Sequence, residues 1–295
     1  MSAHKAGFVN IIGNPNVGKS TLMNALVGER LSIITSKAQT TRHRILGIVN
    51  GEDFQMVISD TPGIIKPAYA LQESMMDFVR SALNDADVLI YMVEIGQKGL
   101  KDEAFLERIQ KTSVPVLLLI NKIDTSDQQT LEEKVDYWEE LLPRAEIFPI
   151  SALEQFNIQP VFDRILELLP EGPPYFPKDQ LTDRPERFFV SEIIREKILR
   201  HYKKEIPYSV EIEVEAFEEG EDLIRIGAVI MVERDSQKGI IIGHKGAALK
   251  RVGSEARKDL ETFFAKKVYL ELFVKVNKNW RSDSRQLRRF GYNSK

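Results

Sequence analysis

Runs of consecutive apolar residues recur through the first 170 positions of this 295-residue chain. Such runs, without alternating polar residues, are typical of strands that are covered on both faces. Helical spacing of apolar residues appears between them, first at 22–27 and again at 101–111. This order of strand and helix predicts an α/β fold with a doubly wound sheet. Its strands are expected at 8–12, 45–49, 54–59, 88–93, 116–120 and 147–150.

The pattern changes after position 170, where four prolines and Gly172 break any regular element and predict a linker. A helical pattern at 188–202 follows, and then glutamate alternates with apolar residues at 210–216, as in a strand with one wet face. These glutamates could form a metal site, but a solvated strand face explains them better. A second strand, two helices and a last strand at 268–276 complete a smaller α+β unit. The predicted parts of the chain are 5–170, 171–184, 185–277 and 278–295.

Composition excludes several classes of protein. The chain has no cysteine, so disulfides, thiolate metal sites and a cysteine nucleophile are ruled out. The net charge of −3 gives no sign of nucleic-acid binding, which must therefore come from local clusters of basic residues. No apolar stretch is long enough for a membrane span, and the start of the chain lacks the features of a signal peptide. We therefore expect a cytoplasmic protein.

The most informative motif lies at 13–20, Gly-Asn-Pro-Asn-Val-Gly-Lys-Ser, between the first strand and the first helix. Gly13 and Gly18 allow the loop to approach a polyphosphate, with backbone N–H groups and the helix N-terminus facing its oxygens. Lys19 can reach the outer phosphates and the Ser20 hydroxyl can bind Mg²⁺. A chance glycine-lysine match in an ordinary turn is the less favoured interpretation, because the strand, loop and helix occur in the required order.

The polar segment 32–44 is rich in hydroxyl groups and predicts a mobile loop. A hydroxyl that closes onto Mg²⁺ and the terminal phosphate would make this loop a sensor of hydrolysis. Thr41 is the first candidate and Thr40 the second. A surface loop without such a role is the alternative.

Asp60, Thr61, Pro62 and Gly63 follow the third strand. At this strand end the Asp60 carboxylate can hold Mg²⁺ through water and the Gly63 N–H can reach the terminal phosphate. Ile64 stands where Ras-type enzymes carry a glutamine that orients the attacking water. Isoleucine has no polar group for this task, so we expect slow hydrolysis by the isolated protein.

Asn121, Lys122 and Asp124 follow the fifth strand. The Asp124 carboxylate can accept two parallel hydrogen bonds from guanine, which adenine cannot donate, and it would be left unpaired with ATP. Ser151 and Ala152, after the sixth strand, would complete the base pocket with their backbone. These strand-end loops together are typical of a Ras-like GTPase domain over 5–170.

The second unit contains a Gly-x-x-Gly motif, Gly243-His244-Lys245-Gly246, between two helical patterns. Such a turn lets the backbone of about four single-stranded nucleotides lie against it. Lys245, Lys250 and Arg251 could contact phosphates. A simple turn between helices is the alternative, which the KH-like order of surrounding elements disfavours.

The last residues combine basic and aromatic side chains, which suits phosphate contact and base stacking. The alternative is a helix that merely caps the domain. The RNA contacts expected in the second unit and the tail are Ile242, Gly243, His244, Lys245, Gly246, Lys250, Arg251, Trp280, Arg281 and Arg285.

A GTPase domain followed by a KH domain of the bacterial type, with Gln39-Thr40-Thr41-Arg42 and the tail from Asn279 to Tyr292, resembles the Era family of ribosome-assembly GTPases. The resemblance implies GTP and GDP binding with Mg²⁺, slow GTP hydrolysis, and binding of the single-stranded 3′ end of small-subunit ribosomal RNA. The implied Mg²⁺ ligands are Ser20, Thr41 and Asp60, the switch residues are Thr40, Thr41, Gly63 and Ile64, and Asn16 would hold K⁺. The implied nucleotide contacts are Gly13, Asn14, Pro15, Asn16, Val17, Gly18, Lys19, Ser20, Thr21, Asp60, Thr61, Pro62, Gly63, Ile64, Asn121, Lys122, Asp124, Ser151 and Ala152.

Two other functions stay open at this point. The chain could be a constitutive RNA-binding scaffold whose nucleotide site is mainly structural. A tRNA-modifying GTPase shares the Thr-Thr-Arg loop but is not expected to carry this C-terminal domain. We expect a monomer that joins the assembling small ribosomal subunit, and the family resemblance adds peripheral contact with the inner face of the cell membrane.

Overall fold

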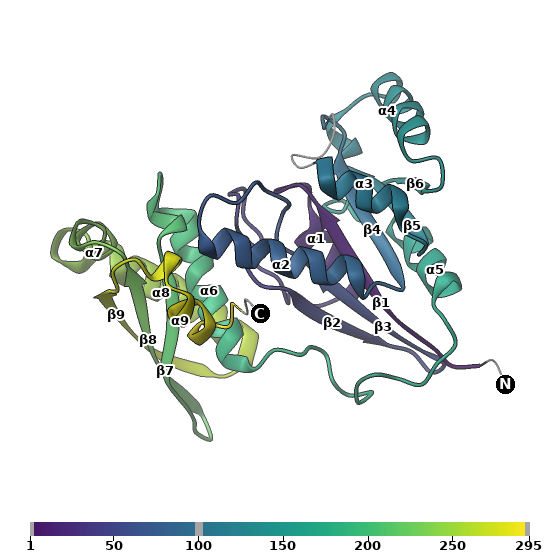
Figure 1. Ribbon diagram of the computed structural model, residues 1–295. Coiled ribbons are helices and arrows are strands. Elements are labelled where there is room, and N and C mark those ends of the chain that lie inside the picture. Colours follow the sequence, from purple (N-terminus) through teal and green to yellow (C-terminus); the bar gives the residue numbers. More distant parts are fainter. Residues whose placement is uncertain (1–2, 98–102, 293–295) are drawn as a thin grey trace. The chain divides into compact units, whose positions relative to one another are not determined.

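The chain forms two compact units (Figure 1). The computed structural model describes residues 3–97 and 103–292. The first unit comprises most of the described chain up to Asp183, and the second runs from Arg184 and also includes Tyr69–Leu71. Positions 101 and 102 of the helix expected at 101–111 and the end of the basic tail lie outside the described residues.

The first unit is built on a six-stranded sheet in the order β2-β3-β1-β4-β5-β6. The strands β1, β3, β4, β5 and β6 run parallel, whereas β2 pairs antiparallel with β3 at one edge. All six strands expected from the sequence are present, so the predicted α/β fold class is confirmed. The strands are β1 Lys5–Gly13, β2 Ile45–Asn50, β3 Phe54–Asp60, β4 Val88–Glu94, β5 Val116–Asn121 and β6 Glu146–Pro149.

Helices alternate with these strands. Helix α2 lies in front of the sheet in Figure 1, while α1 packs against β1, β2 and β3. Helix α1 begins after Gly18 and ends at Gly28, two positions with positive φ that glycine adopts without strain. The helices are α1 Lys19–Val27, α2 Ala70–Asn84, α3 Glu103–Lys111, α4 Gln128–Leu141 and α5 Ile158–Leu168, with a 3₁₀ turn, η1, at Ile123–Thr125.

The centre of this unit is dry. Every residue from Val88 to Val93 in β4 is fully buried, as is every residue from Leu117 to Ile120 in β5. These residues form a continuous apolar run because a parallel strand with helices on its faces meets no solvent. The polar loops at the carboxyl ends of the strands are therefore carried on a rigid base.

The second unit has a three-stranded sheet in the order β7-β8-β9, with β7 antiparallel and β9 parallel to β8. Helix, strand, strand, helix, Gly-x-x-Gly turn, helix and strand follow one another as predicted. Its core contains Ile194, Ile198, Ile230 and Leu260. The elements are α6 Glu186–His201, η2 Ile206–Tyr208, β7 Glu211–Glu219, β8 Leu223–Val232, α7 Asp235–Ile242, η3 His244–Gly246, α8 Ala247–Phe264, β9 Lys267–Val276, η4 Trp280–Ser282 and α9 Ser284–Arg289.

None of the helices in the described part of the chain combines the length and the apolar character that crossing a bilayer requires.

Candidate nucleotide site and RNA-binding groove

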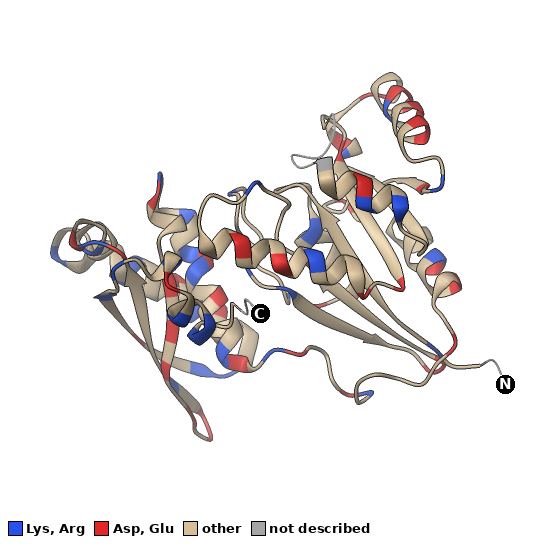
Figure 2. Ribbon diagram, viewed as in Figure 1, with Lys and Arg blue, Asp and Glu red and all other residues tan. Residues whose placement is uncertain are grey.

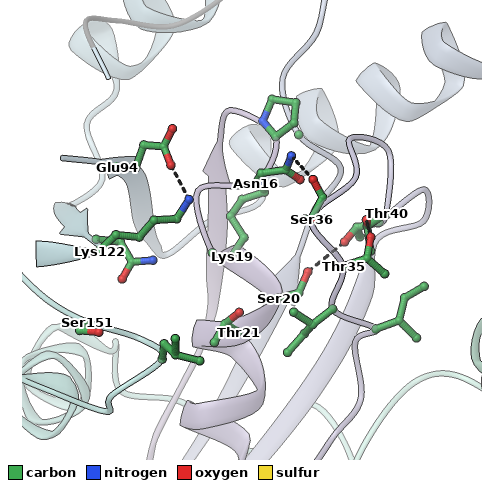
Figure 3. A pocket seen from close by; sticks show the side chains of 18 of the residues that line it. Asn16, Lys19, Ser20, Thr21, Thr35, Ser36, Thr40, Glu94, Lys122 and Ser151 are labelled. Carbon is green, nitrogen blue, oxygen red and sulfur yellow. Dashed lines mark hydrogen bonds and ion pairs between the residues drawn. The ribbon is translucent and has the colours of Figure 1, made fainter. Parts of the chain in front are cut away.

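A cavity of about 510 Å³ opens at the carboxyl ends of the strands in the first unit (Figure 3). It brings together the expected loops from five separate parts of the chain. Predicted residues that line it are Pro15, Asn16, Gly18, Lys19, Ser20, Thr21, Thr40, Thr41, Gly63, Asn121, Lys122, Asp124 and Ser151. The sequence analysis did not assign the lining residues Ile33, Ile34, Thr35, Ser36, Gln39, Glu94, Thr125 and Leu153.

The glycine loop is packed tightly against its neighbours. A Cβ atom on Gly13 would lie 2.2 Å from the Met92 carbonyl oxygen, and one on Gly18 would lie 2.3 Å from Asn121 Nδ2. Lys19 Nζ donates to the carbonyl oxygens of Gly13 at 3.2 Å and Asn14 at 2.8 Å. Burial lowers the pKa of Lys19 to about 8, although the negative charge of Asp60 acts in the opposite direction. The lysine is thus held within the loop that would surround a phosphate.

Three side chains with oxygen atoms, those of Ser20, Thr41 and Asp60, meet near Lys19. Ser20 Oγ donates to Asp60 Oδ2 at 2.7 Å and lies 3.0 Å from Thr41 Oγ1, which donates to the same carboxylate oxygen at 3.3 Å. Asp60 Oδ1 is buried without a hydrogen-bond partner among the described residues. Burial raises the pKa of Asp60, while the Ser20 hydrogen bond and the charge of Lys19 lower it. A hard divalent cation would suit this set of oxygens and relieve the cost of burying the carboxylate.

The two threonine candidates have different surroundings. Thr40 Oγ1 donates to the Lys37 carbonyl oxygen at 2.6 Å and lies 2.6 Å from Thr35 Oγ1. Both partners belong to the same loop, so the Thr40 hydroxyl stabilises the conformation of that loop. Thr41 instead faces Ser20 and Asp60. This geometry favours the first candidate, Thr41, as the hydroxyl that responds to a metal ion.

Ile64 does not face the cavity. Its side chain is fully buried, and its backbone N–H donates to the Gly13 carbonyl oxygen at 3.0 Å. A Cβ atom on the preceding Gly63 would lie 2.6 Å from the backbone nitrogen and Cα of Pro15. The two loops therefore touch at Gly63, and the side chain at position 64 offers no group that could orient water.

The Asn121 side chain ties the base pocket together. Its Nδ2 donates to the Val17 carbonyl oxygen at 2.7 Å, and its Oδ1 accepts from the Ala152 N–H at 2.9 Å. Asp124 lines the same cavity from η1. Lys122, which has a φ of 66°, forms a close ion pair with Glu94. The expected guanine pocket is thus formed by three loops that one buried amide holds in register.

A second cavity, of about 400 Å³, lies in the second unit beside the Gly-x-x-Gly turn. Gly243 and Gly246 have positive φ, and a Cβ atom on Gly243 would lie 2.6 Å from Ala248 Cβ. His244 and Lys245 are exposed at the tip of the turn. The groove is lined by Gly246, Leu249, Lys250, Gly253, Ser254, Arg257, Leu270 and Leu272.

The sequence analysis missed several groove residues, Arg257 and Leu272 among them. The helical spacing of Arg257 from Lys250 and Gly253 could have pointed to it, since residues at these intervals share one face of a helix. Nothing in the sequence near the motif points to Leu272, because β9 reaches the groove only through tertiary packing. Figure 2 shows basic residues on α7 and α9.

The prediction that Trp280 stacks on RNA bases is wrong. The Trp280 side chain is fully buried, its Nε1 donates to the Ser209 carbonyl oxygen at 3.2 Å, and Phe290 packs against it edge to face. Leu287 and Tyr292 are buried as well, and the Tyr292 hydroxyl donates to Glu211 at 2.8 Å. The tail is therefore anchored to its own domain by its aromatic residues and covers part of the β7 face that was expected to be wet.

Two of the tail cations are held by acids of the same unit. Arg281 forms a close ion pair with Glu233, and Arg289 forms one with Glu213. Arg285 is exposed. Of the three tail residues assigned to RNA, Arg285 is thus the one whose side chain is placed for an outside partner.

Two family models match the chain. One, described as 50S ribosome-binding GTPase, matches residues 8–122, and the other, described as KH domain, matches residues 205–281. The two matches fall in the two units that the structure separates.

Full-length relatives match both units together. GTPase Era of Alkaliphilus metalliredigens is 46% identical over 293 residues, which cover 98% of this chain and 99% of the relative. GTPase Era of Staphylococcus epidermidis is 45% identical over 294 residues, 99% of this chain and 98% of the relative. A crystal structure of Era in complex with MgGDPNP and nucleotides 1506–1542 of 16S ribosomal RNA matches with a TM-score of 0.94 and 39% identity, covering 99% of this chain and 100% of that chain. The expected resemblance is confirmed, and the chain belongs to the GTPase Era family.

Proposed function

We propose that this protein binds GTP with Mg²⁺, hydrolyses it slowly, and binds the single-stranded 3′ end of small-subunit ribosomal RNA as a nucleotide-controlled switch in assembly of that subunit. The observation that carries the proposal is the single cavity lined by Lys19, Ser20, Thr41 and Asp124, in a chain that also has a KH groove. The side chains that would bind the phosphates, the metal ion and the base can act on one nucleotide only if they line the same cavity.

At the end of the site that would hold the phosphates and Mg²⁺, each side chain has a separate role. Lys19 and the backbone of the glycine loop hold the outer phosphates. Ser20 and Thr41 bind Mg²⁺, with Asp60 acting directly or through water. A Mg²⁺ ion held by these residues would neutralise the charge that develops on the phosphates during transfer. Since Thr41 lies on the loop at 32–44, its bond to the metal would report whether the terminal phosphate is present.

Hydrolysis is slow because no side chain at position 64 orients water. The Gly63 N–H can hold the terminal phosphate, and the attacking water is positioned by backbone groups or by a factor from outside. At the base end, the Asp124 carboxylate accepts from the guanine N1–H and 2-amino group. ATP cannot satisfy this carboxylate and is rejected by the cost of leaving it unpaired.

RNA binds along the groove beside the Gly-x-x-Gly turn. Gly243 and Gly246 let the sugar-phosphate backbone come close, Leu249 and Leu272 receive bases, and Lys245, Lys250 and Arg257 contact phosphates. The RNA in the matched Era complex is 16S ribosomal RNA, whereas the GTPase family model names the 50S ribosome. We assign the small subunit because the match to the RNA complex includes the KH domain and the GTPase model does not.

We also propose that K⁺ stimulates hydrolysis through Asn16. Asn16 is exposed on the phosphate loop, lines the cavity, and donates from Nδ2 to the Ser36 carbonyl oxygen at 2.9 Å. A cation held by its amide oxygen would lie beside the phosphates. Faster turnover in KCl than in NaCl is expected, and equal rates would contradict this assignment.

The central experiment measures RNA affinity in three states, with GDP, with a non-hydrolysable GTP analogue and without nucleotide. A switch requires affinities that differ between nucleotide states, since a ligand shifts an equilibrium only by its differential binding. Equal RNA affinities would identify the alternative, a constitutive scaffold. Calorimetry with ATP as well as GTP tests the base pocket, because equal binding would refute the role of Asp124.

The cellular setting follows from this function. We propose a cytoplasmic protein, because its proposed partner is ribosomal RNA. We also propose a monomer, because a single chain contains both the nucleotide site and the RNA groove. Peripheral contact with the cell membrane remains a proposal from family resemblance. Flotation with anionic vesicles tests it.

A further inference from the structure

The segment that connects the two units is bonded along the free edge of the first sheet. Among the described strands β2 pairs with β3 alone, and residues 180–183 bond to its other side. Residues 175–183 are here called the strap. The Ile48 N–H donates to the Leu181 carbonyl oxygen at 2.8 Å, and Gly47 pairs antiparallel with Thr182. The strap thus continues the sheet instead of crossing solvent as a loose linker.

Side chains fasten the final residues of the strap to Leu46. Thr182 Oγ1 donates to the Leu46 carbonyl oxygen at 2.7 Å, and Asp183 Oδ1 accepts from the Leu46 N–H at 3.1 Å. Both backbone groups of one β2 residue are therefore held by the strap. A shift of Leu46 must move Thr182 and Asp183 or break these bonds.

The other end of the strap is fixed by a buried amide in β3. Gln55 is fully buried, and its Oε1 accepts from the N–H groups of Tyr175 at 2.7 Å and Phe176 at 2.9 Å. Its Nε2 donates to Asn50 Oδ1 and to the Phe176 carbonyl oxygen, both at 2.8 Å. Every hydrogen-bonding position of this amide is used, so the start of the strap has a firm anchor.

Strand β2 leads directly out of the loop that carries Thr41. Ile45 begins the strand, and Arg44 just before it donates to Ser59 Oγ at 2.7 Å and to Asn10 Oδ1 at 3.0 Å. Ser59 precedes the metal-site residue Asp60. The beginning of β2 is thus tied to two of the three segments that would supply Mg²⁺ ligands, the loop with Thr41 and the end of β3 with Asp60.

The stretch of chain between the strap and the first helix of the second unit is short. Asp183 is bonded to Leu46, and α6 begins at Glu186. Only Arg184 and Pro185 lie between, and the proline ring restricts its own φ. Movement of the last strap residues would therefore be passed along the chain into α6.

We propose that the strap couples the nucleotide site to the RNA-binding unit, with Thr182 and Asp183 as positioning residues and Gln55 as their anchor. This inference rests on the proposed switch function and specifies its regulation. Closing of Thr41 onto Mg²⁺ displaces the start of β2, Leu46 carries the displacement to Thr182 and Asp183, and the first residues of the second unit follow. No residue of the strap lines the nucleotide cavity or the groove, so its loss affects communication and leaves both binding sites intact.

Two full-length variants test the coupling. Thr182→Val combined with Asp183→Ala removes both side-chain bonds to Leu46, and a flexible Gly-Ser-Gly-Ser insert between Asp183 and Arg184 leaves the strap bonded but adds slack. The readout is the ratio of dissociation constants for a short single-stranded RNA in the presence of GDP and of a non-hydrolysable GTP analogue. We expect a wild-type ratio of about 5-fold or more in either direction, which is typical of allosteric coupling. In both variants this ratio should lie within about twofold of 1. Their affinity for GDP should not change.

Asp179→Ala is the matched control, because Asp179 is an exposed strap residue outside the bonds described above. It should keep the wild-type ratio. A wild-type ratio in both test variants would overturn the strap as the coupling element while leaving the switch itself in place. A ratio of one in the unaltered protein, or failure to bind RNA at all, would overturn the switch function and the coupling together.

Discussion

Removing the Asn121 side chain should separate the base pocket from the phosphate loop. Asn121→Ala deletes the donor to the Val17 carbonyl oxygen and the acceptor of the Ala152 N–H, and all of these groups lie in a buried region. Each buried partner left unsatisfied costs roughly 1–3 kcal/mol, so the two together cost about 2–6 kcal/mol. The cost appears partly as lower stability and partly as weaker nucleotide binding, because the bound state needs both loops in place.

The assay is titration of GDP by calorimetry, with urea unfolding measured in parallel. A loss of about 2 kcal/mol in binding corresponds to roughly a 30-fold increase in Kd for GDP. Gln237→Ala is the matched control in the other unit, since the buried Gln237 side chain likewise makes two hydrogen bonds to backbone groups, accepting from the N–H groups of Glu233 and Arg234. It should lower the free energy of unfolding and leave GDP affinity unchanged. Wild-type GDP affinity in Asn121→Ala would refute the argument that this amide holds the loops in register.

Three further predictions follow from the same geometry. Gly63→Ala places a Cβ atom 2.6 Å from the Pro15 backbone, so affinity for a GTP analogue should fall more than affinity for GDP, and an equal effect on both would contradict closure at Gly63. The pKa of Lys19 is lowered from 10.5 to about 8, so the folded protein holds fewer protons than the unfolded chain between those pH values and its stability should rise there. GDP affinity should fall roughly fourfold between about pH 7 and 8.5, because a neutral Lys19 must first take up a proton, and a flat profile would show that it stays charged. Trp280→Ala should lower the free energy of unfolding by about 3–5 kcal/mol. Trp280→Phe should retain RNA affinity, and a selective loss of RNA binding in that variant would restore a stacking role.

Local patterns in the sequence determined the order of the elements and the loops that carry chemistry. Gly13 to Ser20, Asp60 and Asp124 were found because each follows an apolar run that can only be a covered strand, and parallel strands bring their carboxyl ends to one edge. The same reasoning located the Gly-x-x-Gly turn from the helices on either side. These inferences depend on spacing within a few residues, which the chain itself specifies.

Only the tertiary structure decided which side chains turn inward and which remote segments meet. Trp280 belongs to a basic, aromatic stretch typical of RNA contact, yet it is buried because the rest of its domain offers it a pocket and a carbonyl acceptor. Thr41 meets Ser20 and Asp60 whereas the neighbouring Thr40 does not, and nothing in the sequence distinguishes the two. The strap has the sequence of an ordinary proline-rich linker, and only the free edge of β2 gives it a place in the sheet. Burial and hydrogen-bond partners come from residues far away in sequence, so spacing along the chain does not contain them.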